Sequence, residues 1–261
     1  MPEKKLLIFV AINEEFKVVK KHLKDIRPQA KRTDGTKKGE FPRLSGTISG
    51  ISVDLVMTTM GMNQAAKCAD FFIDDSVYGA VLILGYCGGL SLALKNGDVV
   101  IPNKVTSSRD QKTFELDSEL SEILGRVVLT EGHRYRTAPL ITQPFVVETS
   151  DDKRLLFKKS LAEAVDMETS EIVRVSRAKN VKVSALKIVI DDIETELPNF
   201  NEIFARTGRM DRLSVTSAMI AHPHLSMALS ANMKHAGATL HHILPPIIEK
   251  VCEFWKIEKS L

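Results

Sequence analysis

The chain has few cysteines and little net charge. Its 261 residues include three cysteines, far apart and without a Cys-x-x-Cys pair. A disulfide framework or a zinc site is therefore not expected, and a reducing cytoplasm is the expected compartment. The formal net charge of +3 is too small to indicate a nucleic-acid partner. With 44% hydrophobic and 26% charged residues, the composition is that of an ordinary soluble domain.

The chain also lacks a convincing membrane span or targeting segment. One long stretch without a charge, residues 76–94, is long enough to span a membrane but contains four glycines. Glycines at this density favour a buried strand followed by a tight loop. The first apolar run, residues 6–12, is too short for a signal peptide and is followed by acids, so none is expected.

Apolar runs and amphipathic segments alternate along the chain. The runs at 6–12, 80–84 and 183–190 have no polar alternation, which is typical of strands buried on both faces. The other expected strands are 44–49, 52–58, 97–101, 127–129 and one or two within 138–147. The expected helices are 13–23, 64–72, one capped by Asp151 or Asp152, 167–178, and the chain from 212 onward, with breaks near Pro223 and Pro245.

This alternation predicts one α/β domain over residues 1–261, with a central mixed β-sheet flanked by helices. A helical C-terminal extension is expected from about residue 198, and the basic segment 27–43 is expected to be an exposed loop. Polar or glycine-rich clusters follow four expected strands, at 13–15, 58–61, 85–89 and 191–194. In such sheets a ligand lies outside the carboxyl ends of the strands, so these clusters predict one site.

Taken in order, the motifs in these clusters resemble the nucleoside phosphorylase and nucleosidase superfamily. The resemblance is to the bacterial methylthioadenosine/S-adenosylhomocysteine nucleosidase type, over about residues 5–195. Each motif is weak alone, but their shared order and spacing are specific. The motifs are Ala11-Ile-Asn-Glu-Glu15, Thr59-Met-Gly61 followed by Ala65-Ala66, Gly85-Tyr-Cys-Gly-Gly-Leu90, Val165-Asp-Met-Glu168, and the turn at Asp191.

Two further motifs resemble the hopanoid-associated branch of this superfamily. They are Asp191-Asp-Ile-Glu-Thr-Glu-Leu-Pro198 and Gly208-Arg-Met-Asp211. This resemblance implies that the enzyme removes adenine from adenosylhopane. A lipid-linked substrate would need an apolar channel and a peripheral membrane contact. The resemblance further implies a homo-oligomer and no cofactor.

Cleavage of an N-ribosidic bond needs an acid for the leaving purine and a group that activates the attacking species. Asp191, at a buried strand end, suits protonation of the purine. Glu168 suits binding of the ribose hydroxyls, and Glu15 suits activation of water near the anomeric carbon. Met167 is expected to contact the sugar. Gly61, Tyr86, Cys87 and Gly88 are the other expected substrate-binding residues, although Tyr86 replaces a small serine of the nucleosidases.

Structural readings of the same residues remain open. Asp191 can simply end a strand, and Glu168 and Glu15 can complement helix dipoles. Met167 can be core, and Cys87 an inert buried thiol. The histidine pairs His222/His224 and His241/His242 lack the spacing of a helical zinc site, so no metal is expected.

Other function classes also remain for comparison. A non-catalytic nucleoside-binding protein would be expected to lack the acids. Phosphorolysis would need an anion site, for which Arg109, Arg134 and Arg136 are candidates. A dinucleotide-binding domain is disfavoured, because acids rather than a Gly-x-Gly-x-x-Gly turn follow the first strand.

Overall fold

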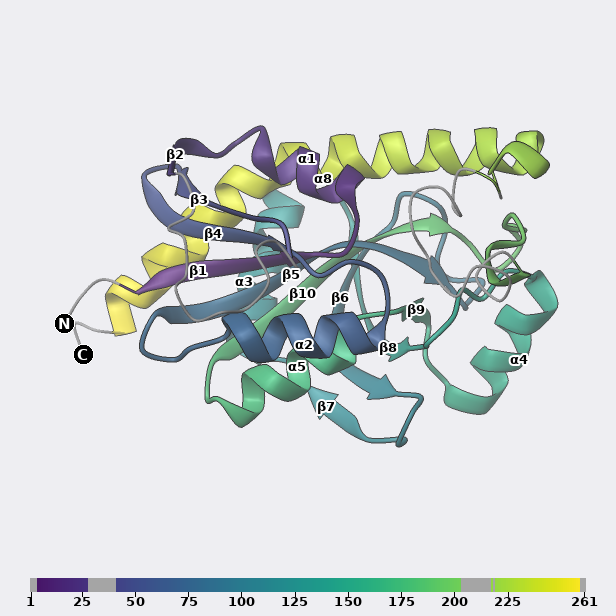
Figure 1. Ribbon diagram of the computed structural model, residues 1–261, viewed down its shortest axis with the longest axis horizontal. Helices are drawn as coiled ribbons and strands as arrows, with labels where there is room; N and C mark the ends of the chain where they lie inside the picture. The colour runs from purple at the N-terminus through teal and green to yellow at the C-terminus, as the bar shows by residue number, and fades with distance from the viewer. Residues whose placement is uncertain (1–3, 28–40, 203–216, 218, 259–261) are drawn as a thin grey trace.

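The computed structural model describes residues 4–27, 41–202, 217 and 219–258. At its centre is a ten-stranded mixed sheet (Figure 1), which confirms the predicted fold class. The strands are β1 (Lys5–Val10), β2 (Lys24–Arg27), β3 (Arg43–Ile48), β4 (Ile51–Met57), β5 (Tyr78–Gly89), β6 (Val99–Ser107), β7 (Thr113–Glu115), β8 (Tyr135–Thr142), β9 (Ala164–Asp166) and β10 (Lys182–Asp191).

Strand β5 is the centre of this sheet. It pairs in parallel with β1 on one side and with β10 on the other, and β1 pairs in parallel with β4. Strand β5 also pairs with β9, so β5, β10, β6, β8 and β9 form a closed ring of paired strands. The carboxyl ends of β4, β1, β5 and β10 therefore lie at one edge, where a ligand site is expected.

Helices cover both faces of the sheet (Figure 1). They are α1 (Asn13–Lys20), α2 (Met62–Phe72), α3 (Ser118–Thr130), α4 (Ser150–Ser160), α5 (Thr169–Ala178) and α8 (Pro223–Glu258). The first face carries α1, α3 and α8, and the second carries α2 and α5. Strand β1 is apolar without a break because both of its faces are buried. Leu6 and Ile8 pack into the hydrophobic core on the first face, here called the first core, and Leu7 packs into the second core, on the other face.

Several sequence-based expectations are corrected. The apolar triplet 127–129 belongs to helix α3, since so short a run does not distinguish a strand from a helix face. The segment 85–89 is not a loop but the end of β5. Helix α8 continues through Pro245 and Pro246. The fully buried Leu244 and Ile247 pack into the first core there and offset the two backbone hydrogen bonds that the prolines cannot donate.

Helix boundaries also differ from the expected ones. Helix α1 ends at Lys20 rather than at 23. The N-cap of α4 is Thr149 rather than Asp151 or Asp152, and its hydroxyl accepts a hydrogen bond from the Asp152 amide. Met167 lies in a bend before α5 rather than in the helix. Short strands β2, β7 and β9 were not expected. Most of the basic segment 27–43 and the motif at 208–211 lie outside the described residues.

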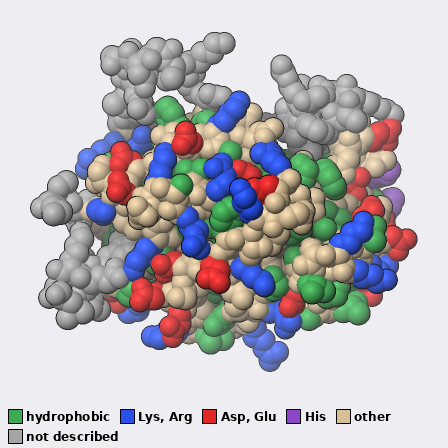
Figure 2. Space-filling model, turned by 90° about the horizontal axis from the view of Figure 1, so that it is seen from below, with side chains coloured by type: hydrophobic (Ala, Val, Ile, Leu, Met, Phe, Trp, Pro, Cys, Tyr) green, Lys and Arg blue, Asp and Glu red, His purple; other side chains and the backbone are tan. Residues whose placement is uncertain are grey.

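The surface and helices provide two further observations. On the face shown in Figure 2, Lys and Arg side chains are interspersed with Asp and Glu, without a field of one sign. Within the described ranges, no helix combines the length and hydropathy needed to cross a membrane.

Candidate active site

The predicted acids meet at the carboxyl-end edge of the sheet. Glu15 lies in the first turn of α1, directly after β1, and Asp191 is the last residue of β10. Glu168 follows β9. All three carboxylic acids are buried: Glu15 is 3% exposed, Asp191 5% and Glu168 6%. Burial of three carboxyl groups at one edge is costly for stability and needs an explanation.

Glu15 is held by backbone donors from the turn after β1 and from β5. Its Oε2 accepts hydrogen bonds from the amides of Ala11 (2.7 Å) and Ile12 (3.0 Å), and its Oε1 accepts one from the Tyr86 amide (2.9 Å). Burial raises the pKa of Glu15, while Lys187 and these amides lower it. The carboxyl group is thus fixed against β5, where Gly85 leaves room for it.

Gly85→Ala is expected to destabilise the fold. A methyl group at this position would overlap the Glu15 carboxyl oxygens, and the three amides prevent that carboxyl from moving away. We expect a loss of about 1–3 kcal/mol in the free energy of unfolding, measured with urea. Gly89→Ala is the comparison variant and should lose less stability, because its methyl group would meet neighbours at 3.3–3.4 Å, which is tight but not an overlap. Equal stability of the two variants would contradict this packing.

Glu168 connects the site to the turn after β4. Its Oε1 accepts a hydrogen bond of 2.8 Å from the amide of Gly61, 107 residues away in sequence. Burial raises the pKa of Glu168 to about 8; Asp166 and Glu15 contribute to this, and Lys187 opposes it. With this pKa, Glu168 is mostly protonated near neutral pH.

A buried lysine that sequence reasoning missed balances this cluster. Lys187 of β10 is 2% exposed, and its Nζ lies 3.0 Å from Asp166 Oδ2. The Thr142 hydroxyl donates to the other oxygen of Asp166 at 2.8 Å. Burial lowers the pKa of Lys187, but Asp166, Glu168 and Glu15 together outweigh it and leave this pKa raised. The available signal was a lysine inside the apolar run 183–190, since a buried cation requires a partner.

Glu168→Gln is expected to stabilise the protein at alkaline pH. Since the pKa of Glu168 rises from 4.5 in the unfolded chain to about 8 in the fold, the folded state binds the extra proton between these values. Stability therefore falls as pH rises through this window, and the amide removes that loss. In urea unfolding, the free energy of unfolding of the variant relative to that of the wild type should be higher at pH 9 than at pH 5. A difference independent of pH, as expected for the exposed control Glu122→Gln, would contradict this.

Asp191 and Asp192 have different surroundings. Asp191 Oδ2 lies 2.7 Å from the Lys153 ammonium, and a methyl group at Gly88 would lie 3.0 Å from the same oxygen. Burial raises the pKa of Asp191 to about 6, against the effect of Lys153. Asp192 instead accepts hydrogen bonds from the Thr195 hydroxyl and the Glu194 amide, and its pKa is lowered.

The remaining predicted residues are near the acids but differ in orientation. Tyr86 contributes its backbone amide to Glu15, whereas its ring packs in the first core and its hydroxyl reaches the Met233 carbonyl at 3.4 Å. Cys87 is buried in the second core, and burial raises the pKa of its thiol. Met167 is half-buried. The binding of substrate by these three residues stays a prediction.

The candidate phosphate-binding arginines do not converge on the acids. Arg136 makes a bidentate pair with Glu163, at 2.6 and 3.0 Å. Arg109 donates to Asn63 at 2.7 Å, and Arg134 is exposed. Among the described residues, no group of three or more His, Cys, Asp or Glu side chains has the arrangement of a metal site.

Comparison with known proteins identifies the family. The family model of the phosphorylase superfamily matches residues 5–221. The chain belongs to the phosphorylase superfamily. This membership confirms the predicted enzyme class, in which nucleosidases and phosphorylases cleave N-glycosidic bonds.

Individual relatives in the superfamily are distant in sequence. A 5'-methylthioadenosine/S-adenosylhomocysteine nucleosidase of Buchnera aphidicola subsp. Schizaphis graminum is 24% identical over 203 residues, covering 72% of this chain and 83% of the relative. The nucleosidase of the same name from Neisseria meningitidis, in complex with methylthio-immucillin-A, has a TM-score of 0.73 and 17% identity, covering 94% and 99% of the two chains. A futalosine hydrolase mutant of Helicobacter pylori has a TM-score of 0.74 and 14% identity, covering 95% and 100%.

Proposed function

We propose that this protein hydrolyses the N-ribosidic bond of a 5'-substituted adenine nucleoside and releases adenine. The observation that carries the proposal is the burial of Glu15, Glu168 and Asp191 at one sheet edge in three different electrostatic environments. Titratable groups whose surroundings separate their pKa values are the usual basis of acid and base roles in one site. The names of the nucleosidase relatives support the same reaction class.

The proposed reaction assigns one task to each acid. The bond between the anomeric carbon and purine N9 breaks, its electron pair moves into the purine, and Asp191 donates a proton to N7. Water attacks the anomeric carbon, and Glu15 accepts the proton that water loses. Glu168, held by Gly61, binds the ribose hydroxyls. The products are adenine and the free 5-substituted ribose.

The charges around Glu15 favour water over phosphate. Even with Glu168 protonated, the carboxyl groups of Glu15 and Asp166 face one ammonium among the described residues, that of Lys187. A phosphate dianion would be repelled there. Arg136 is engaged with Glu163. Phosphorolysis is the alternative reaction, and its dependence on added phosphate distinguishes it.

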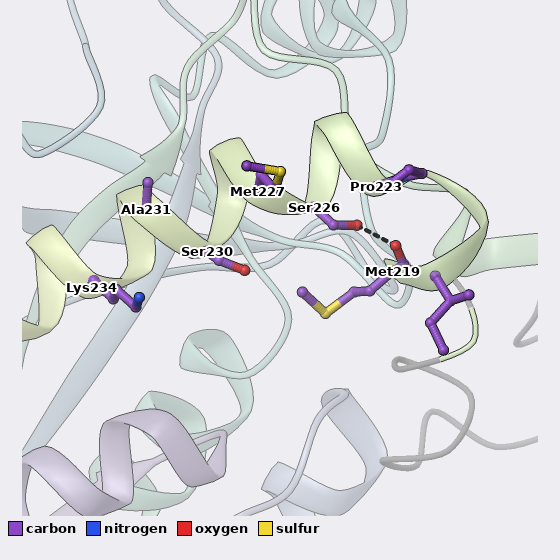
Figure 3. Close-up of a pocket in the computed structure, with 8 residues that line it drawn as sticks. Met219, Pro223, Ser226, Met227, Ser230, Ala231 and Lys234 are labelled. Carbon is purple, nitrogen blue, oxygen red and sulfur yellow. Dashed lines mark hydrogen bonds between the residues drawn. The ribbon is translucent and has the colours of Figure 1, made fainter.

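We further propose that the 5' substituent is large and apolar, as in adenosylhopane. The support is an apolar hollow formed by the first turns of α8 and by Met219 and Ile220 just before it, shown in Figure 3. In this hollow, Ile220 and Met227 are each 74% exposed. The same helix reaches the site, because the Asn232 side chain donates to the carbonyl of Ile190, the residue before Asp191, at 2.9 Å. The exposed apolar residues would provide the peripheral membrane contact.

A substrate panel tests the reaction. Methylthioadenosine, adenosylhomocysteine, inosine and a lipid-linked adenosine are incubated with the protein, each with and without phosphate, and free base is measured. Adenine release without phosphate is expected, with the lipid-linked substrate preferred. Absence of base release from every substrate would overturn the proposal, and strict phosphate dependence would replace it with phosphorolysis.

A sedimentation experiment tests the lipid-linked part separately. The protein is expected to co-sediment with liposomes and to lose this binding when both Ile220 and Met227 are replaced by serine. Replacement of the exposed Phe145, which is outside this hollow, is the control. No liposome binding, together with rapid turnover of methylthioadenosine, would rule out the lipid-linked substrate.

We also propose that the protein is a homo-oligomer in solution, which light scattering tests.

A further inference from the structure

Lys153 is a fully buried lysine on an otherwise exposed helix. It lies in the first half of α4, whose neighbouring Arg154 and Leu155 are exposed, yet its own exposure is 0%. All three hydrogens of its ammonium have acceptors. These are Asp191 Oδ2 at 2.7 Å, the Asp192 carbonyl at 2.9 Å and the Thr195 carbonyl at 2.7 Å.

Packing alone does not account for this lysine. Burial of an ammonium group carries a desolvation cost of several kcal/mol, and an apolar side chain of similar size often packs as well or better. Two of its three acceptors are neutral carbonyls from the chain after β10. These carbonyls hold the ammonium in place whether or not Asp191 is ionised. The positive charge is therefore preorganised beside one oxygen of the proposed acid.

We propose that Lys153 is a positioning residue that holds the Asp191 carboxyl against Gly88 and stabilises the negative charge that Asp191 acquires when it protonates the leaving purine. This inference deepens the proposed function and rests on it. Preorganised charge is most effective where charge develops during the reaction. Here it develops on Asp191 as the proton moves to the purine, 2.7 Å from the ammonium.

The surroundings of Asp191 agree with this role. Burial alone would make Asp191 a weak acid, and Lys153 is the charge that opposes burial. The other charged neighbour, Asp192, acts in the same direction as burial, and Lys95 pairs with Asp192 at 3.6 Å. Cys87, the thiol nearest on β5, stays neutral because burial raises its pKa. Lys153 therefore keeps the pKa of Asp191 near neutral pH, where a general acid is most effective.

Lys153→Met tests this inference in the full chain. We expect kcat to fall by about 10- to 100-fold with little change in KM, and the alkaline limb of the kcat profile to move to higher pH. A nitrophenyl riboside with the same 5' group needs no proton on its leaving group, so its turnover should remain unchanged. Lys158→Met, exposed on the same helix, is the control and should behave as wild type.

Two results would overturn the inference. One is a folded Lys153→Met protein with the wild-type pH profile, and the other is an equal loss of turnover on the purine nucleoside and the nitrophenyl riboside. If the wild type releases no base at all, the proposed function fails, but the link between Lys153 and Asp191 is still measured. Carbon NMR titration of the Asp191 carboxyl should then show its pKa higher in Lys153→Met than in the wild type; an unchanged pKa contradicts the inference.

Discussion

Asp191→Asn is expected to lower kcat for adenine release by a factor on the order of 10³, the usual contribution of a positioned general acid. The amide has no proton of suitable acidity for purine N7, although it fits the space beside Gly88 and Lys153. KM should change little, because the purine still occupies its site. Steady-state kinetics at pH 6, where the pKa of about 6 leaves half of Asp191 protonated, gives the comparison.

Asp192→Asn is the matched control for this variant. Asp192 closes the turn after β10 through the Thr195 hydroxyl and the Glu194 amide. Both donors reach the same oxygen, Oδ1, which the asparagine amide oxygen can replace. We therefore expect kcat to fall less than about 10-fold, with a loss of stability of about 1 kcal/mol because a charged acceptor becomes neutral. If the two variants lost activity equally, the distinct roles of the adjacent acids would be wrong.

Glu15→Gln is expected to reduce kcat by about 10²- to 10⁴-fold, because the amide cannot accept the proton that water loses. Unlike the Asp191 variant, it should also unfold more easily. The carboxylate accepts three backbone N–H donors with its two oxygens, so the glutamine NH₂ must face at least one of those donors. We expect a cost of about 1–3 kcal/mol for the donor left unpaired.

Kinetics at a temperature well below unfolding separates these two effects. Glu14→Gln is the control, since Glu14 is the exposed neighbour in the same helical turn and should match the wild type in both respects. A Glu15→Gln protein that keeps wild-type kcat while losing stability would show that Glu15 is structural. Retention of nucleoside binding, measured by calorimetry, shows that the site is intact.

Sequence patterns predicted the fold and the three acids for an identifiable physical reason. Long apolar runs without alternation mark strands buried on both faces, and polar residues directly after them fall at one edge of a parallel arrangement. Glu15 and Asp191 both follow such strands. Where runs were short, as at 127–129, the same reasoning failed, because a helix can present three adjacent apolar residues.

The cations of the site could not be predicted in the same way. Lys187 is in sequence a single charge within an apolar strand, and Lys153 is one of several lysines on a polar helix. Their burial depends on long-range contacts with Asp166 and Asp191, across strands and between α4 and β10. Such contacts join residues that are distant in sequence and have no local periodicity, so they are seen only in the folded structure.

The most direct test of the account is the identity of the sugar product. The protein is incubated with methylthioadenosine in phosphate buffer, and the products are separated and identified by mass spectrometry. The account predicts free adenine and an equal amount of free 5-methylthioribose, at a rate independent of phosphate and lost in Asp191→Asn. A sugar 1-phosphate, or adenine release that persists in Asp191→Asn, would contradict it.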